Sequence, residues 1–244
     1  VYNTPQKYLQ QMIESVCEQT YDKWELCIAN ANPENLEVQI ILDEYKKKDS
    51  RIKVVDVPEN LGIAQNTNKA YEISTGQYIA LLDHDDMLAT NALYEVVRTI
   101  NEKNKSEVIY TDEDKISENS NEHFQPNFKP EFNLDLLRAN NYICHLFVFK
   151  RTLIKESEPF REEYNGAQDY DLILRCTEQA ENIAHISKIL YHWRMHRQST
   201  ADNPASKLYA YDAGERALQA HLNRCGEVGR IEKLDDLGFY KIIY

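Results

Sequence analysis

The sequence predicts an α/β fold, with a mostly parallel central sheet flanked by helices and a small C-terminal extension. Short β-rich stretches alternate with amphipathic helical stretches through the first half of the chain. Residues 78–82 are almost continuously apolar, which is typical of a parallel strand buried on both faces. Because helices connect such strands in a repeated β-α-β order, the pattern predicts a parallel sheet covered by helices.

Each element of the first half has a local signal. The stretch at 33–48 places apolar residues at helical spacing, with Pro33 in its first turn and lysines at its end. Gly76 interrupts the next helical pattern ahead of the apolar run. The expected elements, in order, are a strand over 24–29, a helix over 33–48, a strand over 51–57, a helix over 61–74, a strand over 78–82, a helix over 90–101 and a strand over 107–110.

The second half opens with a polar stretch, residues 111–132, which contains two prolines and predicts a long loop over the sheet. After it we expect a short helix over 134–139, a strand over 143–149, a helix over 168–179, a strand over 183–191 and a helix over 205–225. Residues 1–225 are expected to form one domain and 226–244 a small β appendage. Because no apolar strand precedes Val1, the chain is predicted to be a fragment that lacks its first strand.

Composition excludes several functional classes. The chain has 28 basic and 40 acidic side chains among 244 residues, a net charge of −12, which argues against sequence-independent nucleic-acid binding. No stretch of about 18 apolar residues occurs and no signal peptide is recognisable, so no membrane span is expected. Five cysteines without a C-x-x-C pair favour a reducing compartment. The expected location is the cytoplasm, including the inner face of the cell membrane.

The strongest local motif is Asp83-His84-Asp85-Asp86, directly after the apolar run. Ligands of open α/β sheets bind at the carboxyl ends of strands, and in an extended chain Asp83 and Asp85 project to the same side. Carboxylates are suited to Mg²⁺ or Mn²⁺, and such an ion would let an acidic protein hold a diphosphate. The alternative is that Asp85 or Asp86 caps the following helix and the other carboxylates are solvated.

Two further segments carry candidate functional groups. Asp169 and Asp171 lie at the start of a predicted helix, where a carboxylate is favoured in its ionised form. Spacing alone favours an ordinary N-cap over a general base there. In the segment 192–197, two arginines and a histidine are suited to a diphosphate, or one histidine completes the metal shell. A solvated basic segment is an equally good interpretation.

Taken together, these stretches resemble family 2 glycosyltransferases with the GT-A fold, especially members from bacterial surface-polysaccharide assembly. The similarity covers nearly the whole chain, and the order and spacing of the motifs carry it. The motifs are Val1-Tyr2-Asn3-Thr4, Ser15-Val16-Cys17-Glu18-Gln19-Thr20-Tyr21, Asn60-Leu61-Gly62-Ile63-Ala64 with Asn68, Thr75-Gly76-Gln77-Tyr78-Ile79, Asp83-His84-Asp85-Asp86, Tyr110-Thr111-Asp112-Glu113-Asp114, Phe128-Lys129-Pro130 and Gly166-Ala167-Gln168-Asp169-Tyr170-Asp171-Leu172.

The resemblance implies an inverting transfer of a sugar from a nucleotide-diphosphate donor, expected to be a UDP-sugar, to a hydroxyl of a growing glycan or glycolipid. It implies Asp169 as the catalytic base and Mn²⁺ or Mg²⁺ as the cofactor, with Asp83, Asp85 and His196 as metal ligands. The donor-binding residues that it implies are Tyr2, Thr4, Asn30, Asn60, Gly62, Asn68, Asp83 and Arg197.

One position departs from the family pattern. The family usually has D-D-x-S after its second strand, with the first aspartate bonding the nucleobase, whereas this chain has Asn30-Ala31-Asn32-Pro33. An asparagine side chain both donates and accepts, so uracil can still be met, but the base preference is open. Alternatives are a non-catalytic nucleotide-sugar or glycan-binding domain of a larger assembly protein, and a nucleotidyltransferase. The latter usually has a glycine-rich basic loop, which residues 1–8 lack. Association with a membrane surface or a larger chain is a further expectation.

Overall fold

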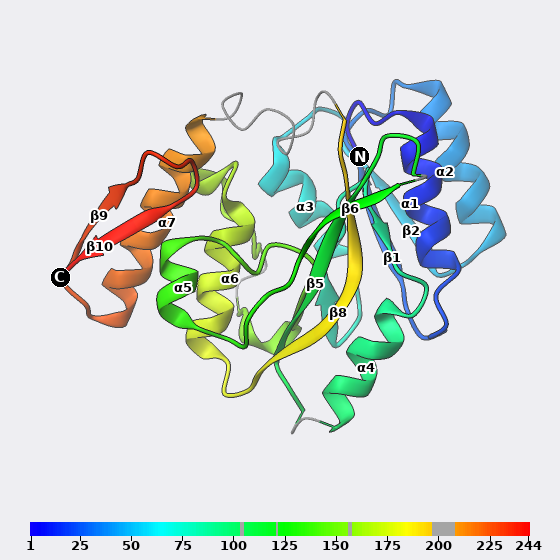
Figure 1. Cartoon of the computed structure of the whole chain (residues 1–244). Helices are drawn as coiled ribbons and strands as arrows, with labels where there is room; N and C mark the ends of the chain where they lie inside the picture. Colours follow the sequence, from blue (N-terminus) through cyan, green and yellow to red (C-terminus); the bar gives the residue numbers. More distant parts are fainter. Residues whose placement is uncertain (103–104, 121, 156–157, 197–207) are drawn as a thin grey trace.

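The computed structural model describes residues 1–102, 105–120, 122–155, 158–196 and 208–244 of the chain. Helices lie on both sides of a curled central sheet, with the two ends of the chain on different sides of the molecule (Figure 1). The predicted α/β class is confirmed. Among the described residues, every helix is too short or too polar to cross a membrane.

The N-terminal part packs two helices against a two-stranded parallel sheet. Its elements are α1 (Gln6–Cys17), β1 (Leu26–Asn30), α2 (Leu36–Lys48) and β2 (Ile52–Asp56). Leu9 and Ile13 of α1 share a core with Ile28 of β1 and Leu42 of α2. The Asn35 side chain caps α2 by accepting hydrogen bonds from the backbone of Glu37 and Val38. Helix α1 was not among the expected elements.

The central six-stranded sheet is mixed in direction, which corrects the expectation of a mostly parallel sheet. The strand order is β3-β7-β5-β8-β4, and β6 also pairs with β5. Only β5 and β8 pair in parallel within it, and its other pairings are antiparallel. The reason is that β7 enters between β3 and β5 in the opposite direction. The expectation of a fully buried strand over 78–82 is also wrong, because β3 lies at the end of the strand order, with Tyr78 and Ile79 half-buried and Ala80 exposed.

The elements that build this sheet and its covering helices follow in chain order. They are α3 (Ile63–Glu72), β3 (Tyr78–Ala80), β4 (Met87–Leu88), α4 (Ala92–Glu102), β5 (Val108–Ile116), β6 (His123–Asn127), α5 (Leu134–Ala139), β7 (Phe147–Lys150), η1 (Arg151–Leu153), η2 (Glu162–Tyr164), α6 (Gln168–Gln179), β8 (Ile183–Arg194) and α7 (Leu208–Cys225).

The expectation of a long loop over residues 111–132 is wrong. Strand β5 continues to Ile116, and β6 returns beside it as an antiparallel partner. The polar residues of β5 are tolerated in a buried strand because histidines of β8 pair with them. Asp112 lies 2.8 Å from His185 Nε2, and Asp114 lies 2.6 Å from His192 Nδ1. Paired carboxylates avoid the free-energy cost that an isolated buried charge has.

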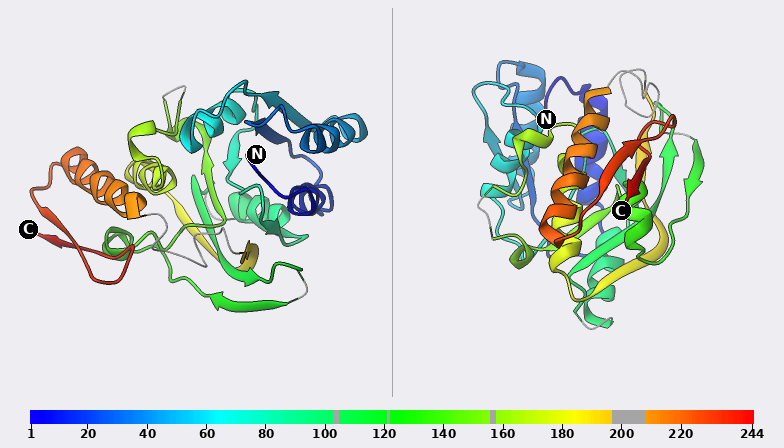
Figure 2. Two further views of the ribbon diagram at one scale, coloured as in Figure 1. Left: turned by 90° about the horizontal axis from the view of Figure 1, so that it is seen from above. Right: turned by 90° about the vertical axis from the view of Figure 1, so that its left-hand side faces the viewer.

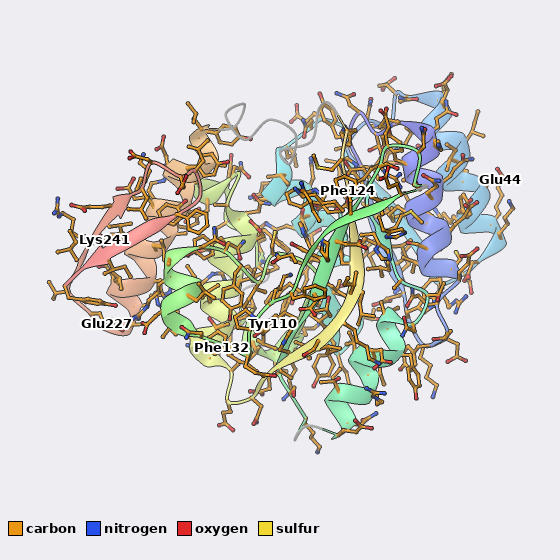
Figure 3. The ribbon with its side chains drawn as sticks, viewed as in Figure 1. Glu44, Tyr110, Phe124, Phe132, Glu227 and Lys241 are labelled. Atoms are coloured by element: carbon orange, nitrogen blue, oxygen red, sulfur yellow. The ribbon has the colours of Figure 1, made fainter. Side chains whose placement is uncertain are left out.

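The tail beyond α7 forms a two-stranded antiparallel sheet, β9 (Arg230–Lys233) and β10 (Tyr240–Ile243). Figure 2 shows this hairpin beside α7, far from α1 and α2. Tyr240 is buried in the same core as α6 and α7, and its hydroxyl donates to the Tyr211 carbonyl at 3.0 Å. In Figure 3, Tyr110 lies inside the molecule, whereas Glu44 and Lys241 project from its surface.

Candidate active site

The acidic turn between β3 and β4 is anchored by its last residue, Asp86. This side chain is 1% exposed and accepts hydrogen bonds from the Tyr191 hydroxyl at 2.6 Å and the Arg194 backbone N–H at 2.8 Å. Burial raises the pKa of Asp86 well above its usual range, and the charges of Asp83 and Asp85 raise it further. Asp86 therefore joins the turn to β8 and is not the cap of the next helix.

Asp85 is held against the segment after β8. Its Oδ2 lies 2.8 Å from His196 Nε2, and its backbone carbonyl accepts a 2.6 Å hydrogen bond from Arg194 Nε. The structure therefore brings together two of the three predicted metal ligands, which are 111 positions apart in the sequence. His192 of the same motif points away from this pair, toward Asp114.

Asp83, the third predicted ligand, has a side chain that is 60% exposed. Its Oδ2 lies 3.7 Å from Nε2 of His145, a residue that the sequence analysis did not identify. The imidazole of His145 stacks on the Tyr191 ring with centroids 4.5 Å apart and an interplanar angle of 8°. Nothing in the spacing around His145 distinguishes it from a histidine of the core, so only the structure reveals it.

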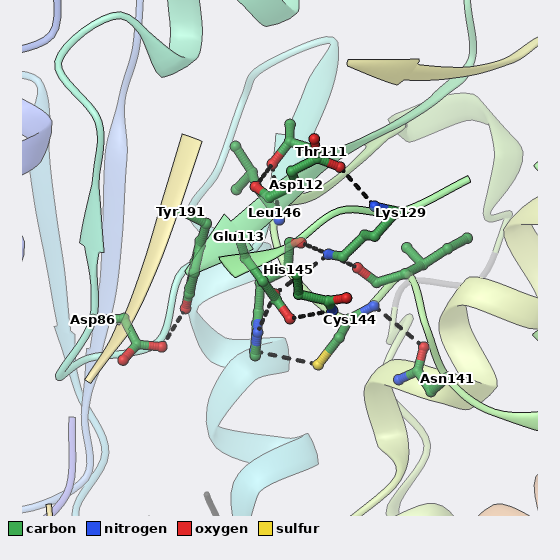
Figure 4. Close-up of polar contacts among 12 residues, drawn as sticks. Asp86, Thr111, Asp112, Glu113, Lys129, Asn141, Cys144, His145, Leu146 and Tyr191 are labelled. Atoms are coloured by element: carbon green, nitrogen blue, oxygen red, sulfur yellow. Dashed lines mark hydrogen bonds and ion pairs between the residues drawn. The ribbon is translucent and has the colours of Figure 1, made fainter. Parts of the chain in front are cut away.

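A buried ionic network lies behind His145 (Figure 4). His145 Nδ1 is 3.1 Å from Glu113 Oε2, and Lys129 Nζ is 3.3 Å from the same oxygen. Burial alone would raise the pKa of Glu113, but the bond to His145 and the Lys129 charge outweigh it and lower that pKa to about 2. Burial likewise opposes charge on His145, yet its contacts with Cys144, Asp83 and Glu113 raise its pKa well above the usual value.

Asp169 lies in the first turn of α6. The N-cap position is Ala167, which makes no side-chain cap, so neither acid caps α6, although both lie in its first turn as expected. Asn141 Nδ2 donates to Asp169 Oδ2 at 3.0 Å. Burial raises the pKa of Asp169, and the nearby His145 charge partly offsets it. A carboxylate with a raised pKa is a stronger proton acceptor, as a general base requires.

The second acid of that pair has a different role. Asp171 is fully buried between two arginines, Arg161 and Arg175, and its Oδ2 lies 3.0 Å from Arg175 Nε. Because both its oxygens are engaged by guanidinium groups, Asp171 stabilises the interior. Asp169 alone of the pair shares its surroundings with His145 and Asp83.

One predicted donor-binding motif borders the acidic turn, and a second forms the turn before α3. Thr4 Oγ1 lies 2.9 Å from His84 Nδ1, which places the N-terminal segment against the turn, and Tyr2 nearby is exposed. Asn60 accepts hydrogen bonds from the Gly62 N–H at 3.1 Å and the Asn66 amide at 2.7 Å, which shapes the turn before α3.

The loop before α6 docks on the start of α3. The Ala64 N–H donates to Asn165 Oδ1 at 3.1 Å. Gly62 has φ +86, and a Cβ there would lie 3.3 Å from Asn165 Nδ2. A glycine suits both this backbone conformation and this close approach. The Asn60-to-Gly62 turn and the Asp169 segment are thereby fixed side by side.

The other predicted donor contacts are buried or undescribed. The Asn30 amide is fully buried and donates to Gln39 Oε1 and Asp56 Oδ1, each at 3.0 Å. Asn68, also fully buried, exchanges two hydrogen bonds with the Phe160 backbone, at 2.8 and 2.9 Å. Arg197 lies outside the described residues. The roles of these residues in donor binding remain predictions.

The ligand chemistry of the turn fits a divalent cation. Asp83 and Asp85 offer carboxylate oxygens and His196 an imidazole nitrogen, and the exposed Asp83 side chain is open to solvent. Carboxylates are suited to Mg²⁺ and Mn²⁺, and a nitrogen ligand favours the softer Mn²⁺. The arrangement therefore combines a candidate cation site with a candidate base, Asp169, whose pKa the charge of Asp83 influences.

Comparison with known sequences identifies relatives. A family model described as glycosyl transferase family 2 matches residues 1–157, more than half of the chain. The uncharacterized protein y4gI of Sinorhizobium fredii is 46% identical over 226 residues, covering 92% of this chain and 25% of the relative. The O-antigen biosynthesis protein RfbC of Myxococcus xanthus is 32% identical over 231 residues, covering 95% of this chain and 18% of the relative. The chain thus spans about a quarter or less of these relatives.

Solved structures share the fold. The S. aureus protein TarS, residues 1–349 in complex with UDP-GlcNAc, aligns with a TM-score of 0.69 at 20% identity, covering 89% of this chain and 63% of that 1–349 chain. The mannosyltransferase PcManGT from Pyrobaculum calidifontis, in complex with GDP-Man and Mn²⁺, aligns with a TM-score of 0.63 at 15% identity, covering 94% of this chain and 63% of PcManGT. These likenesses confirm the predicted GT-A fold.

Proposed function

The chain belongs to glycosyl transferase family 2, and from this premise we propose that it is a metal-dependent enzyme that inverts the anomeric carbon of its donor. Membership of the family makes it a glycosyltransferase and decides against a nucleotidyltransferase. The observation that carries the proposal is the 2.8 Å contact between Asp85 and His196 beside the exposed carboxylate of Asp83.

Asp83, Asp85 and His196 are proposed to hold Mn²⁺ or Mg²⁺. When bound, such an ion supplies positive charge that neutralises the departing diphosphate. Asp86 fixes the turn through Tyr191 and Arg194, so the carboxylates are positioned before a ligand arrives. Preorganisation of this kind avoids reorganisation during the reaction.

Asp169 is proposed to accept the proton of the acceptor hydroxyl. In a single in-line displacement, a bond forms between the acceptor oxygen and the anomeric carbon, and the bond from that carbon to the diphosphate oxygen breaks. The proton passes to Asp169, and the electron pair leaves with the nucleoside diphosphate. Asn141 orients the carboxylate through its 3.0 Å hydrogen bond.

The donor is proposed to be a UDP-sugar. TarS, which shares the fold, was solved with UDP-GlcNAc. Asn30 stands where the family usually has an aspartate, but its amide is bonded to Asp56, an exposed carboxylate at the end of β2. Asp56 thus restores a hydrogen-bond acceptor near the lost one, as the N3–H of uracil requires.

The acceptor is proposed to be a hydroxyl of a growing surface glycan or glycolipid, since a relative is named for O-antigen biosynthesis. We propose that the reaction takes place in the cytoplasm, where nucleotide sugars are the substrates. The chain would act there at the membrane face or as part of a larger chain. The relatives extend beyond the region that matches this chain, and any activity of that additional region is outside this proposal.

The test is calorimetric titration of UDP in the presence and absence of Mn²⁺. We expect Mn²⁺ to support UDP binding by the wild type and Asp85→Ala to abolish this metal-dependent binding, because it removes the ligand bonded to His196. Asp22→Ala, which removes an exposed carboxylate elsewhere, is the matched control. Unchanged Mn²⁺-supported affinity in Asp85→Ala would contradict the proposal.

A further inference from the structure

We propose a second metal site, formed by Asp114, His123 and His192, that binds a borderline-soft divalent ion of the Zn²⁺ class. Asp114 bridges the two imidazoles. Its Oδ1 lies 2.6 Å from His192 Nδ1, and its Oδ2 lies 2.9 Å from His123 Nδ1. One ligand atom from each residue can be chosen so that all lie within 4.8 Å of one another.

The sheet register explains why these residues converge. Asp114 of β5 is directly opposite His192 of β8, and His123 of β6 is opposite Ile116, two residues along β5 from Asp114. Because side chains alternate between faces, Asp114 and Ile116 share one face, and their cross-strand neighbours share it with them. Figure 1 shows β6, β5 and β8 gathered at this part of the sheet.

The same alternation separates the cluster from His145 and Asp83. Glu113 and Tyr191, the neighbours of Asp114 and His192, contact His145 beside Asp83. Asp114 and His192 therefore point to the other face of the same two strands. An ion bound there would not replace the ion proposed at Asp83 and Asp85.

The ligand atoms of the cluster determine which class of ion it prefers. Two imidazole nitrogens and one carboxylate oxygen suit Zn²⁺ better than Mg²⁺, which prefers oxygen ligands. A comparable cluster of Glu178, His221 and Cys225 is less suitable, because Arg224 lies 2.6 Å from Glu178 and Arg138 Nε lies 3.1 Å from His221 Nε2. These guanidinium groups would repel a cation.

The site is accessible and adjustable. The His123 side chain is 53% exposed on β6, while Asp114 and His192 are mostly buried. Both imidazoles line a cavity of about 330 Å³ that Ser15, Glu18 and Ser120 also line. The ligand atoms around a tetrahedral zinc ion lie about 3.3 Å apart. The hydrogen-bonded distances from Asp114 to His192 and to His123, 2.6 and 2.9 Å, would therefore lengthen by less than about 1 Å when an ion replaces the hydrogen-bonding protons. A water molecule from the cavity completes the coordination.

The experiment is calorimetric titration of Zn²⁺ into the metal-free chain without nucleotide. We expect one ion to bind at this site, and His123→Ala and His123→Gln each to weaken that binding by at least about 100-fold, because even residues behind the ligands change metal affinity 10- to 100-fold. His123→Gln keeps a hydrogen-bonding side chain and, since the residue is exposed, both variants are expected to fold. Asp85→Ala disrupts the proposed donor site, and Cys225→Ser disrupts the cluster of Glu178, His221 and Cys225. Both variants should still bind the ion at Asp114, His123 and His192.

Cobalt supplies a second readout. Co²⁺ bound by two imidazoles at a low coordination number should give visible absorption bands that disappear in His123→Gln. The proposal fails if the wild type binds no Zn²⁺, if the His123 variants bind it unchanged, or if Asp85→Ala or Cys225→Ser removes it. No nucleotide or turnover enters the measurement, so its failure is distinguishable from failure of the proposed function.

Discussion

Single residues of the acidic turn differ in role because they differ in burial. Asp83 is largely exposed, with its Oδ2 3.7 Å from His145 Nε2, whereas Asp86, three positions later, is buried and bonded to Tyr191 and Arg194. Burial favours the protonated form of a carboxyl group, and exposure favours the charged form. The same chemical group is thus a proposed metal ligand at one position and a structural hydrogen-bond partner at the other.

At this scale the clearest prediction concerns Asp169. Asp169→Asn removes the proton acceptor but keeps the size of the side chain, so we expect turnover to fall by about 10² to 10⁴-fold while UDP binding is retained. Steady-state kinetics and calorimetry measure the two effects. Full sugar transfer by this variant would refute the role of Asp169.

Asn141→Ala is a companion variant that removes the hydrogen-bond partner of Asp169 but keeps Asp169 itself. The Asn141 amide bonds to Asp169 and favours the charged carboxylate, so its loss should raise the pKa of Asp169 further. A base works when deprotonated, and the acidic limb of the kcat profile should therefore move to higher pH. If the acidic limb of the pH profile of kcat does not move, a group other than Asp169 controls that limb.

At the scale of elements, the loop before α6 positions Asp169, the proposed base. Gly166 has φ +94, and a Cβ there would lie 2.7 Å from Tyr209 Cε2 and 3.0 Å from the Ala210 backbone. This close approach packs the loop against α7, three residues before Asp169. Gly226 has a similar φ of +70, but no atom outside its chain neighbours lies within 4 Å of the position of a Cβ.

These two glycines form a matched pair. Gly226→Ala should lower the free energy of unfolding by about 1 to 2 kcal/mol, through backbone strain alone. Gly166→Ala should lower it by about 1 to 3 kcal/mol more, because the methyl group also clashes with α7, and should reduce turnover by displacing Asp169. Chemical denaturation measures both. If both variants lose the same unfolding free energy, α7 shifts to accommodate the methyl group at position 166 without destabilising the fold.

At the scale of the whole molecule, an acidic protein places buried bases beside its buried acids. Glu113 has a pKa of about 2 in the folded chain, below its ordinary value of 4.5. A depressed pKa stabilises the folded state above pH 4.5, and this stability is lost as the pH falls toward 2. Acid should therefore weaken the network of Glu113, His145 and Lys129.

Glu113→Gln tests this dependence. Between pH 5 and pH 3, the wild type should lose about 2 kcal/mol more unfolding free energy than the variant. Other acids titrate in both proteins, so the difference between the two curves reports on Glu113. Urea denaturation across this pH range measures it, and parallel curves would contradict the pKa shift.

The sequence by itself determined the α/β class, most helices and strands, and the residues of the acidic turn. These features leave local signals, since apolar periodicity marks an element and Asp83 and Asp85 follow an apolar run. The sequence also offered a histidine of residues 192–197 to complete a metal shell with Asp83 and Asp85, and resemblance to a family singled out His196, which the structure places against Asp85.

Only the tertiary structure decided which way the strands run and which side chains meet. Strand β7 enters between β3 and β5, so the sheet is mixed, and residues 111–116 continue a strand because His185 and His192 pair with its acids. His145 and the cluster around Asp114 come from segments far apart in the sequence. Local patterns reflect the burial of each residue, whereas the partner of a buried charge depends on how distant strands align.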